Sequence, residues 1–269
     1  MKFSVLLSIY RKEQPTFLQQ SLDSIFTQTL LPDEVVLVKD GPLTDELDQV
    51  VEDYTLKYPI LKVIPISVNQ GLGKALNEGL KHCSFDLVAR MDTDDIAFPT
   101  RFEKQIKVFH EYQEVDIVGT WIDEFIGSKE NVISSRKLPC YHSDLSQYAK
   151  SRSPLNHVTV MFKKETVERA GGYQAMFLYE DYFLWIRMLL NGAIFYNIQE
   201  SLVWVRNSDN MYRRRGGWKY TFTEIKFFSY LYQIGFISMW EYFKDVNIRL
   251  CVRLLPNCFR KWIYIYILR

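Results

Sequence analysis

Short apolar runs alternate with helical stripes of apolar residues through the first 125 positions of the chain. Runs rich in β-branched residues predict strands, which fall at residues 3–9, 34–39, 61–66, 86–91 and 115–122. Between the strands, apolar residues three and four positions apart predict helices, the first of them marked by Leu18, Leu22 and Ile25. Strands that alternate with helices of about 10 to 15 residues predict an α/β protein, with a mostly parallel sheet covered by helices on both faces.

In such a sheet the residues directly after each strand are the first candidates for a binding site, because ligands lie beyond the carboxyl ends of the strands. The first four strand ends comprise Ser8 to Arg11, Lys39 to Pro42, Asn69 to Lys74 and Met91 to Asp95. Acidic side chains stand at two of these ends, so their chemistry decides how the site is interpreted.

Three carboxylates, Asp92, Asp94 and Asp95, are crowded at the end of the fourth strand. Two carboxylates about 4 Å apart repel each other by roughly 1 to 4 kcal/mol, so such crowding is costly unless a cation lies among them. Mg²⁺ or Mn²⁺ fits, because it takes one or two protein carboxylates and completes its shell with water and substrate phosphates. A helix N-cap is the alternative interpretation. A calcium loop fails, because Ile96 and Ala97 occupy positions that need an oxygen ligand and a glycine.

Two other strand ends carry weaker signals. Residues 71–74 (GLGK) lack both the third glycine of a dinucleotide fingerprint and the four-residue gap of a P-loop, which excludes those two phosphate sites. The pair Asp40-Gly41 is typical of a turn, and it is equally compatible with a carboxylate that contacts a base or a ribose.

A second acidic pair, Glu180 and Asp181, precedes the strongly apolar segment 183–190. Acids at the start of a buried helix stabilise its positive end by about 0.3 to 1 kcal/mol each, which is a purely structural explanation. A carboxylate held against an apolar wall also has a raised pKa and could remove a proton from a sugar hydroxyl within hydrogen-bond reach. Spacing alone leaves both interpretations open.

Five segments together resemble the family 2 glycosyltransferases in order and spacing. They are residues 4–10 (SVLLSIY), 39–41 (KDG), 69–77 (NQGLGKALN), 90–95 (RMDTDD) and 179–185 (YEDYFLW). The resemblance covers roughly residues 3 to 210 and is greatest to bacterial enzymes that build capsule, exopolysaccharide or O-antigen repeats. Residues 157–162 and 171–173 are also similar to that group.

The resemblance implies a GT-A fold, in which a Rossmann-like sheet forms a nucleotide-sugar-binding half (1–125) and an acceptor-binding half (126–211) follows. It implies inverting transfer that depends on Mn²⁺ or Mg²⁺, held by Asp94 together with Asp92. Asp181 becomes the expected catalytic base, which deprotonates the acceptor hydroxyl as it attacks the anomeric carbon. Paired glycosidase carboxylates work differently, because they must supply an acid to the leaving oxygen.

The resemblance also assigns residues to the substrates. Ile9 and Tyr10 would line the base pocket through backbone contacts, Asp40 would contact uracil and Asp92 would lie near ribose and diphosphate. The complete expected set for the donor nucleotide is Ile9, Tyr10, Asp40, Gly71, Lys74, Asp92 and Thr93. Acceptor or diphosphate contacts are expected from Glu180, His157, Arg213, Arg214 and Arg215. For the three arginines, a solvated basic turn and a patch that faces lipid phosphates are open alternatives.

The C-terminal region, residues 212–269, differs from the rest of the chain in charge and aromatic content. The whole chain carries +1, yet this region has eleven Lys or Arg against three acids, a net +8, and 15 of the last 52 residues are aromatic. A basic amphipathic helix with interfacial aromatics binds anionic membrane surfaces, and packing of the same aromatics on the acceptor half is the alternative. Nucleic acid is not an expected partner, because the body is acidic and no nucleic-acid module is recognisable.

Further sequence features predict where in the cell the expected enzyme is located. The first residues do not form a secretory signal, and no apolar stretch reaches the roughly 18 residues that a membrane span requires. The four cysteines form neither a CxxC pair nor a disulfide framework, which suits a reducing compartment. We therefore expect a cytoplasmic protein, peripheral at the inner face of the plasma membrane, and leave its self-association open.

The function predicted from these features is transfer of a sugar from a nucleotide-sugar donor, most consistent with UDP, to a lipid-linked or oligosaccharide acceptor in bacterial surface polysaccharide synthesis. Two alternatives are a sugar nucleotidyltransferase and a non-catalytic, membrane-associated protein that binds nucleotide sugars. A nucleotidyltransferase normally has a glycine-rich, arginine-bearing loop after its first strand. Residues 8–12 (SIYRK) contain no glycine, which counts against it.

Overall fold

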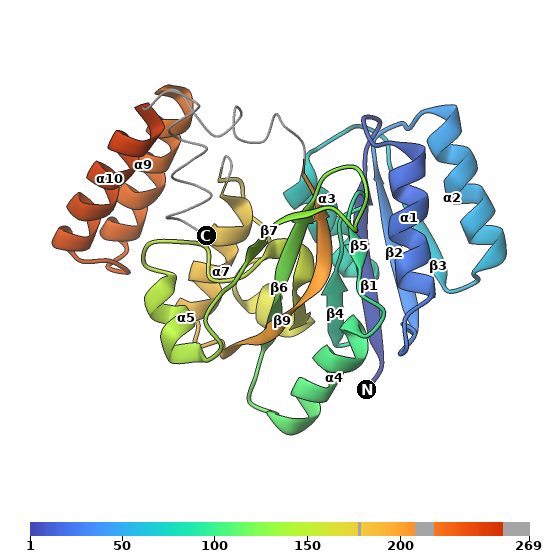
Figure 1. The fold of residues 1–269 in the computed structure, drawn as a ribbon, viewed down its shortest axis with the longest axis horizontal. Coiled ribbons are helices and arrows are strands. Elements are labelled where there is room, and N and C mark those ends of the chain that lie inside the picture. The colour runs from blue at the N-terminus through green and yellow to red at the C-terminus, as the bar shows by residue number, and fades with distance from the viewer. Residues whose placement is uncertain (177–178, 208–217, 255–269) are drawn as a thin grey trace.

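A mixed nine-stranded sheet forms the centre of the molecule (Figure 1). The computed structural model describes residues 1–176, 179–207 and 218–254, and in the last range the side chains of 221–251. The strand order is β3-β2-β1-β4-β8-β6-β9-β5, and β7 pairs with β6. The strands are β1 (Phe3–Ile9), β2 (Glu34–Asp40), β3 (Leu61–Ile66), β4 (Leu87–Arg90), β5 (Ile96–Ala97), β6 (Ile117–Phe125), β7 (Val132–Arg136), β8 (Met161–Lys163) and β9 (Phe195–Arg206).

Most of these strands run in one direction, as the sequence predicts. Strands β3, β2, β1 and β4 pair in parallel. Strand β8 is antiparallel to both β4 and β6, so β6 and its parallel neighbour β9 run in the same direction as β4. Strands β5, β7 and β8 run in the opposite direction. The predicted α/β class is confirmed, and the carboxyl ends of the parallel strands meet at one edge.

Helices cover both faces of the sheet because the strands are apolar on both sides. In β1, Phe3, Val5 and Leu7 belong to one apolar cluster, whereas Leu6 belongs to a second cluster on the opposite face. The helices are α1 (Pro15–Phe26), α2 (Asp45–Lys57), α3 (Leu72–His82), α4 (Arg101–Glu111), α5 (His142–Tyr148), α6 (Lys164–Arg169), α7 (Glu180–Leu190), α9 (Trp218–Gln233) and α10 (Met239–Leu254), with a 3₁₀ turn η1 at His157–Thr159. Strands buried on both faces are typical of doubly covered parallel sheets.

The α9–α10 hairpin lies at the opposite end of the molecule from α1 and α2 (Figure 1). A third apolar cluster attaches it to α7: Phe227, Phe228 and Leu231 of α9 pack with Tyr182 and Ile186 of α7. Part of the aromatic C-terminal region therefore packs on the body, which was one of the two interpretations of its sequence. Within the described ranges, none of the helices has the combination of length and apolar character that a bilayer crossing requires.

Glu34, the first residue of β2, is a buried carboxylate whose contribution to stability can be measured. Ser4 Oγ donates to it at 2.6 Å, Ser84 Oγ at 2.7 Å and the Ser84 amide at 2.8 Å, and Lys62 forms an ion pair with it. Burial alone would raise the pKa of Glu34, but the hydrogen bonds from Lys62, Ser4 and Ser84 outweigh it and lower the pKa from 4.5 to about 2. The ionised form is thus the one that the fold stabilises.

We expect Glu34→Gln to lower the free energy of unfolding by about 2 kcal/mol at pH 7. Because the pKa is depressed in the folded chain, the contribution of Glu34 is complete above pH 4.5 and is lost as the pH falls toward 2. Urea unfolding at pH 7 and pH 3 measures the difference, with the exposed Glu111→Gln as the matched control. A penalty that is equal at both pH values would contradict this explanation.

Candidate active site

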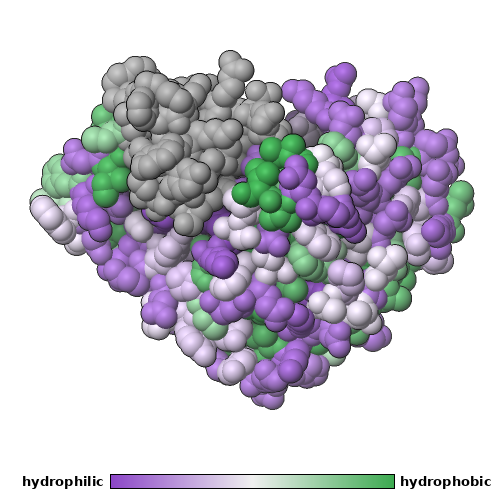
Figure 2. All heavy atoms as spheres, viewed as in Figure 1, coloured by the Kyte–Doolittle hydropathy of each residue, from purple (hydrophilic) through white to green (hydrophobic). Residues whose placement is uncertain are grey.

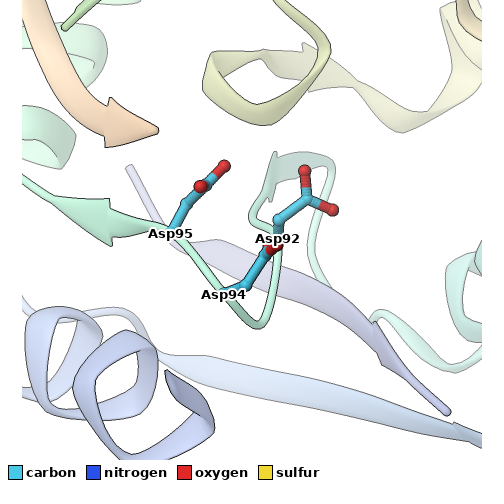
Figure 3. Close-up of side chains that lie close together, drawn as sticks. All are labelled: Asp92, Asp94 and Asp95. Carbon is cyan, nitrogen blue, oxygen red and sulfur yellow. The ribbon is translucent and has the colours of Figure 1, made fainter. Parts of the chain in front are cut away.

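A tight turn between β4 and β5 carries three carboxylates (Figure 3). One ligand atom from each of Asp92, Asp94 and Asp95 lies within 4.8 Å of the others. Asp92 and Asp94 line a pocket of about 500 Å³, whereas the side chain of Asp95 is buried and accepts a hydrogen bond from the Arg206 amide at 2.8 Å. Two acids thus line the pocket, and the third is buried and binds the backbone at the end of β9.

The pocket collects residues from four strand ends. Its lining comes from the carboxyl ends of β1 and β2 and from the segments that follow β1, β3 and β4. The lining residues are Ser8, Tyr10, Lys12, Glu13, Asp40, Asn69, Gly71, Leu72, Asp92, Thr93 and Asp94. Of the residues expected to bind the donor, Tyr10, Asp40, Gly71, Asp92 and Thr93 are therefore brought together. The other two are not among its lining residues: the Ile9 side chain is buried in the core, and Lys74 is exposed in the first turn of α3.

Two arginines hold the acidic turn in place. Arg90 forms an ion pair with Asp92. Arg206, the last residue of β9, donates from Nε to the Asp94 carbonyl at 3.0 Å, and its guanidinium carbon lies 3.8 Å from the ring centroid of Phe17. Arg206 belongs to none of the motifs that predict the site from the sequence. Its position at the end of a strand is the one signal that could have found it.

Burial and mutual repulsion disfavour the ionised form of the carboxylates in this turn. Burial, then repulsion from Asp92 and Glu13, raises the pKa of Asp94 to about 6. Burial, with repulsion from Asp94 and Asp92, also raises the pKa of Asp95 well above its usual range. Crowded carboxylates whose charge is incompletely compensated are the donor set that a divalent cation needs, so these residues fit a metal.

Asp40 shapes the pocket wall by binding the loop between β3 and α3. Its carboxylate accepts hydrogen bonds from the Gln70 amide at 2.7 Å, the Gly71 amide at 2.9 Å and Asn69 Nδ2 at 2.9 Å. Gly41 allows this close approach, because it has φ +84° and a Cβ there would lie 2.8 Å from the Asn69 nitrogen. The structure thus gives Asp40 a turn-forming role, while its place in the pocket wall keeps it within the expected nucleotide site.

Asp181 and Glu180 form the first turn of α7, next to the packed α9 helix. Tyr179, just before them, stacks on Phe227 with ring centroids 4.7 Å apart. Burial raises the pKa of Asp181, and hydrogen bonding to the Tyr182 amide and the charges of Arg136 and Arg90 partly offset it. Burial and the charge of Asp181 also raise the pKa of Glu180.

His157 lies in the 3₁₀ turn η1, with its Nε2 2.9 Å from the Tyr173 hydroxyl. Burial, and then the charge of Arg90, lowers the pKa of His157 well below its usual range, so its ring is neutral near pH 7. The backbone of Tyr173 is bound in turn by Asn77 of α3, which donates to its carbonyl and accepts from its amide, both at 2.7 Å. These contacts attach the loop that carries Tyr173 to helix α3.

Arg90 is a buried cation whose charge acts both on the acidic turn, through Asp92, and on Asp181. It is 1% exposed, and its charge acts on Asp92, His157, Tyr173 and Asp181. Within the described part of the chain, its Nε and Nη1 have no hydrogen-bond partner. Arg90 belongs to the motif at residues 90–95, which by itself predicts no role for it. The three arginines expected near the diphosphate, Arg213, Arg214 and Arg215, lie outside the described residues.

Comparison with known proteins identifies the family of the chain. A model of the family described as glycosyl transferase family 2 matches residues 4–175, which is more than half of the chain. The chain belongs to this family. The glycosyltransferase is 42% identical to the UDP-Gal:alpha-D-GlcNAc-diphosphoundecaprenol beta-1,3-galactosyltransferase of Escherichia coli, over 100% of its own length and 97% of that protein.

Other curated relatives of this glycosyltransferase carry names from bacterial polysaccharide synthesis. The amylovoran biosynthesis glycosyltransferase AmsE of Erwinia amylovora is 41% identical over 97% of both chains. The O-antigen biosynthesis glycosyltransferase WbnJ of Escherichia coli is 31% identical over 69% of this chain and 71% of that protein. The resemblance predicted from the sequence motifs is thus confirmed.

Solved structures confirm the GT-A fold. The mannosyltransferase PcManGT from Pyrobaculum calidifontis, in complex with GDP-Man and Mn²⁺, superposes with a TM-score of 0.66 at 17% identity, covering 96% of this chain and 71% of that one. Staphylococcus aureus TarS residues 1–349, in complex with UDP-GlcNAc, gives a TM-score of 0.64 at 20% identity, covering 98% and 70%. At these identities the likeness concerns the fold.

Proposed function

We propose that this glycosyltransferase moves a sugar from a UDP-linked donor, with inversion, to an acceptor carried on a lipid diphosphate in the synthesis of a bacterial surface polysaccharide. The observation that carries the proposal is the pocket at the carboxyl ends of the parallel strands, which joins Asp40 to the acidic turn. The Escherichia coli relative, whose name specifies a UDP-sugar donor and a diphosphoundecaprenol acceptor, supports the choice of substrates.

The acidic turn fits a divalent metal, Mn²⁺ or Mg²⁺, which Asp94 and Asp92 would hold. When bound, such an ion supplies positive charge that offsets the charge of the leaving diphosphate. Thr93 donates to Glu13 at 3.0 Å, and Ser21 donates to the Asp92 carbonyl at 2.7 Å. These bonds orient the turn, so the two carboxylates face the pocket before a substrate arrives.

Asp181 is the residue that we assign to proton removal. A general base must be ionised and within hydrogen-bond reach of the acceptor hydroxyl. Arg90 and Arg136 favour the ionised form of Asp181 against the effect of burial. The neutral His157 and the hydroxyl of Tyr173, hydrogen-bonded to each other, supply polar groups near the charge of Arg90 that could orient acceptor hydroxyls.

The place of action that we propose is the cytoplasmic face of the plasma membrane, where a lipid-linked acceptor meets a water-soluble nucleotide sugar. The names of the relatives support it, because amylovoran, O-antigen and diphosphoundecaprenol are products or substrates of surface polysaccharide synthesis. Peripheral association with anionic lipid accords with the basic, aromatic composition of residues 212–269.

A transfer assay tests the proposal. The purified chain, with MnCl₂ and a set of UDP- and GDP-sugars, is incubated with GlcNAc diphosphate on a short, water-soluble alkyl chain. We expect release of UDP and an acceptor that gains the mass of one hexosyl or N-acetylhexosaminyl residue. By NMR, the anomeric configuration of the new bond should be opposite to that of the sugar in the donor. Release of pyrophosphate from UTP and a sugar phosphate would indicate a nucleotidyltransferase instead, and binding without turnover of any donor would indicate a non-catalytic protein.

A further inference from the structure

Helix α10 exposes an apolar stripe on the side that faces away from the body. Its exposed residues recur at helical spacing along the whole described face, and Trp240 is 78% exposed. The apolar residues of the stripe are Met239, Trp240, Phe243, Ile248 and Cys251, and the exposed Lys244 and Asn247 lie among them. We call these seven residues together the outer face of α10. Single exposed apolar residues are common on protein surfaces, but a stripe of them on one helix is typical of an interaction site.

The acidic side chains of α10 do not belong to its outer face. Glu241 accepts a hydrogen bond from Lys150 at 3.0 Å, and Asp245 is buried near Arg249. Across residues 221–251, whose side chains the structure describes, the exposed charged residues are Lys226 and Lys244. The surface of the hairpin therefore combines large apolar side chains with positive charge, and the charges that would repel an anionic surface are withdrawn.

Large apolar side chains together with positive charge match the chemistry of an anionic lipid surface. Trp and Phe side chains enter the boundary between head groups and acyl chains, and each Lys near an anionic surface contributes about 1 kcal/mol. A second copy of this chain would bring the same lysines into opposition, which disfavours it. Figure 2 shows hydrophobic side chains at the outer edge of the molecule, over the α9–α10 hairpin.

We propose that the outer face of α10 docks on an anionic lipid surface and thereby orients the active site toward a lipid-linked acceptor. The second part rests on the function proposed above. The inner side of the hairpin is fixed relative to α7, because Phe227 and Phe228 of α9 pack against Tyr182 and Phe183 of α7. Helix α7 begins with Glu180 and Asp181, so the docking hairpin and the expected base belong to one packed unit.

Co-sedimentation with vesicles tests the docking surface. We compare the full chain with the double variant Trp240→Ser, Phe243→Ser on vesicles of phosphatidylglycerol and phosphatidylcholine. Leu56→Ser is the matched control, because Leu56 is 79% exposed on α2, at the other end of the molecule. We expect the double variant to bind at least about tenfold more weakly, since two large apolar side chains no longer enter the lipid, and the control to bind like the original chain.

Two results would overturn the inference. The first is unchanged vesicle binding by the double variant; if that variant also loses self-association in light scattering, a second copy is the occupant. The second is equal binding to vesicles of phosphatidylcholine alone, which would remove the role of charge.

A second readout separates the inference from the proposed function. Transfer to a long-chain acceptor embedded in vesicles should fall at least about tenfold more in the double variant than transfer to the water-soluble acceptor. An equal fall with both acceptors would contradict the orienting role of the outer face. If the original chain transfers sugar to neither acceptor, the proposed function fails, while the vesicle-binding result still decides the docking surface.

Discussion

Replacing Asp181 by Asn is expected to abolish sugar transfer while leaving donor binding intact. Asparagine keeps the size of the side chain but cannot take a proton, and loss of a general base lowers the rate by roughly 10²- to 10⁴-fold. Asp181 is not among the residues that line the strand-end pocket, so the affinity for UDP should change little. The rate of UDP release with acceptor present and calorimetric titration with UDP measure the two effects.

Glu180→Gln is the matched control for this experiment, because Glu180 shares the first turn of α7 with Asp181. We expect a much smaller loss of rate from it. The pH profile provides a further check: because burial raises the pKa of Asp181, transfer should fall as the pH drops through that raised value, earlier than for an ordinary aspartate. A near-normal rate in Asp181→Asn would exclude this residue as the base.

Asp94→Asn is expected to remove the dependence of UDP binding on a divalent metal. Loss of an outer-shell partner alone lowers metal affinity by roughly 10- to 100-fold, and loss of a direct carboxylate ligand should exceed this. Calorimetric titration with UDP, with and without MnCl₂, measures the effect. In the original chain MnCl₂ should strengthen UDP binding, and in the variant the two affinities should coincide. Equal metal dependence in both chains would refute the assignment of Asp94.

Thermal unfolding distinguishes this loss of function from damage to the fold. Burial and the repulsion of Asp92 and Glu13 raise the pKa of Asp94 to about 6, so its ionised form destabilises the metal-free chain above that pH. In chelator at pH 7.5 the Asp94→Asn variant should therefore unfold at a temperature higher by about 2 to 5 °C. A lower unfolding temperature would indicate that Asp94 mainly holds the turn together.

The sequence predicted the sheet and the position of the pocket because both follow from local patterns. Strands such as β1 are mostly apolar runs with polar residues directly after them, so Tyr10, Asp40 and Asp94 could be placed at one edge before any contact was known. Five motifs in order then supplied the family. The short strand β8 has three residues and no periodicity of its own, so its antiparallel place between β4 and β6 had no local signal.

Contacts between distant segments were not predictable in the same way. Arg206 supports Asp94 and Asp95 across more than 110 residues of sequence, and neither segment carries a pattern that names the other. The C-terminal aromatics posed a similar problem, since hydrophobicity alone does not distinguish Phe227, buried against α7, from Trp240, exposed on α10. Only the packing of α9 on α7 determines that Phe227 is buried and Trp240 is exposed.

The pairing of β6 has a practical consequence for engineering new linkages. Strand β6 ends at Phe125, yet its neighbours β8 and β9 come from the later part of the chain, and β8 also pairs with β4. Chimeras that exchange everything after residue 125 between relatives would cut one continuous hydrogen-bond ladder and join strands from different parents. Grafting the surface loops of one relative onto an intact sheet of another is the design that this topology favours.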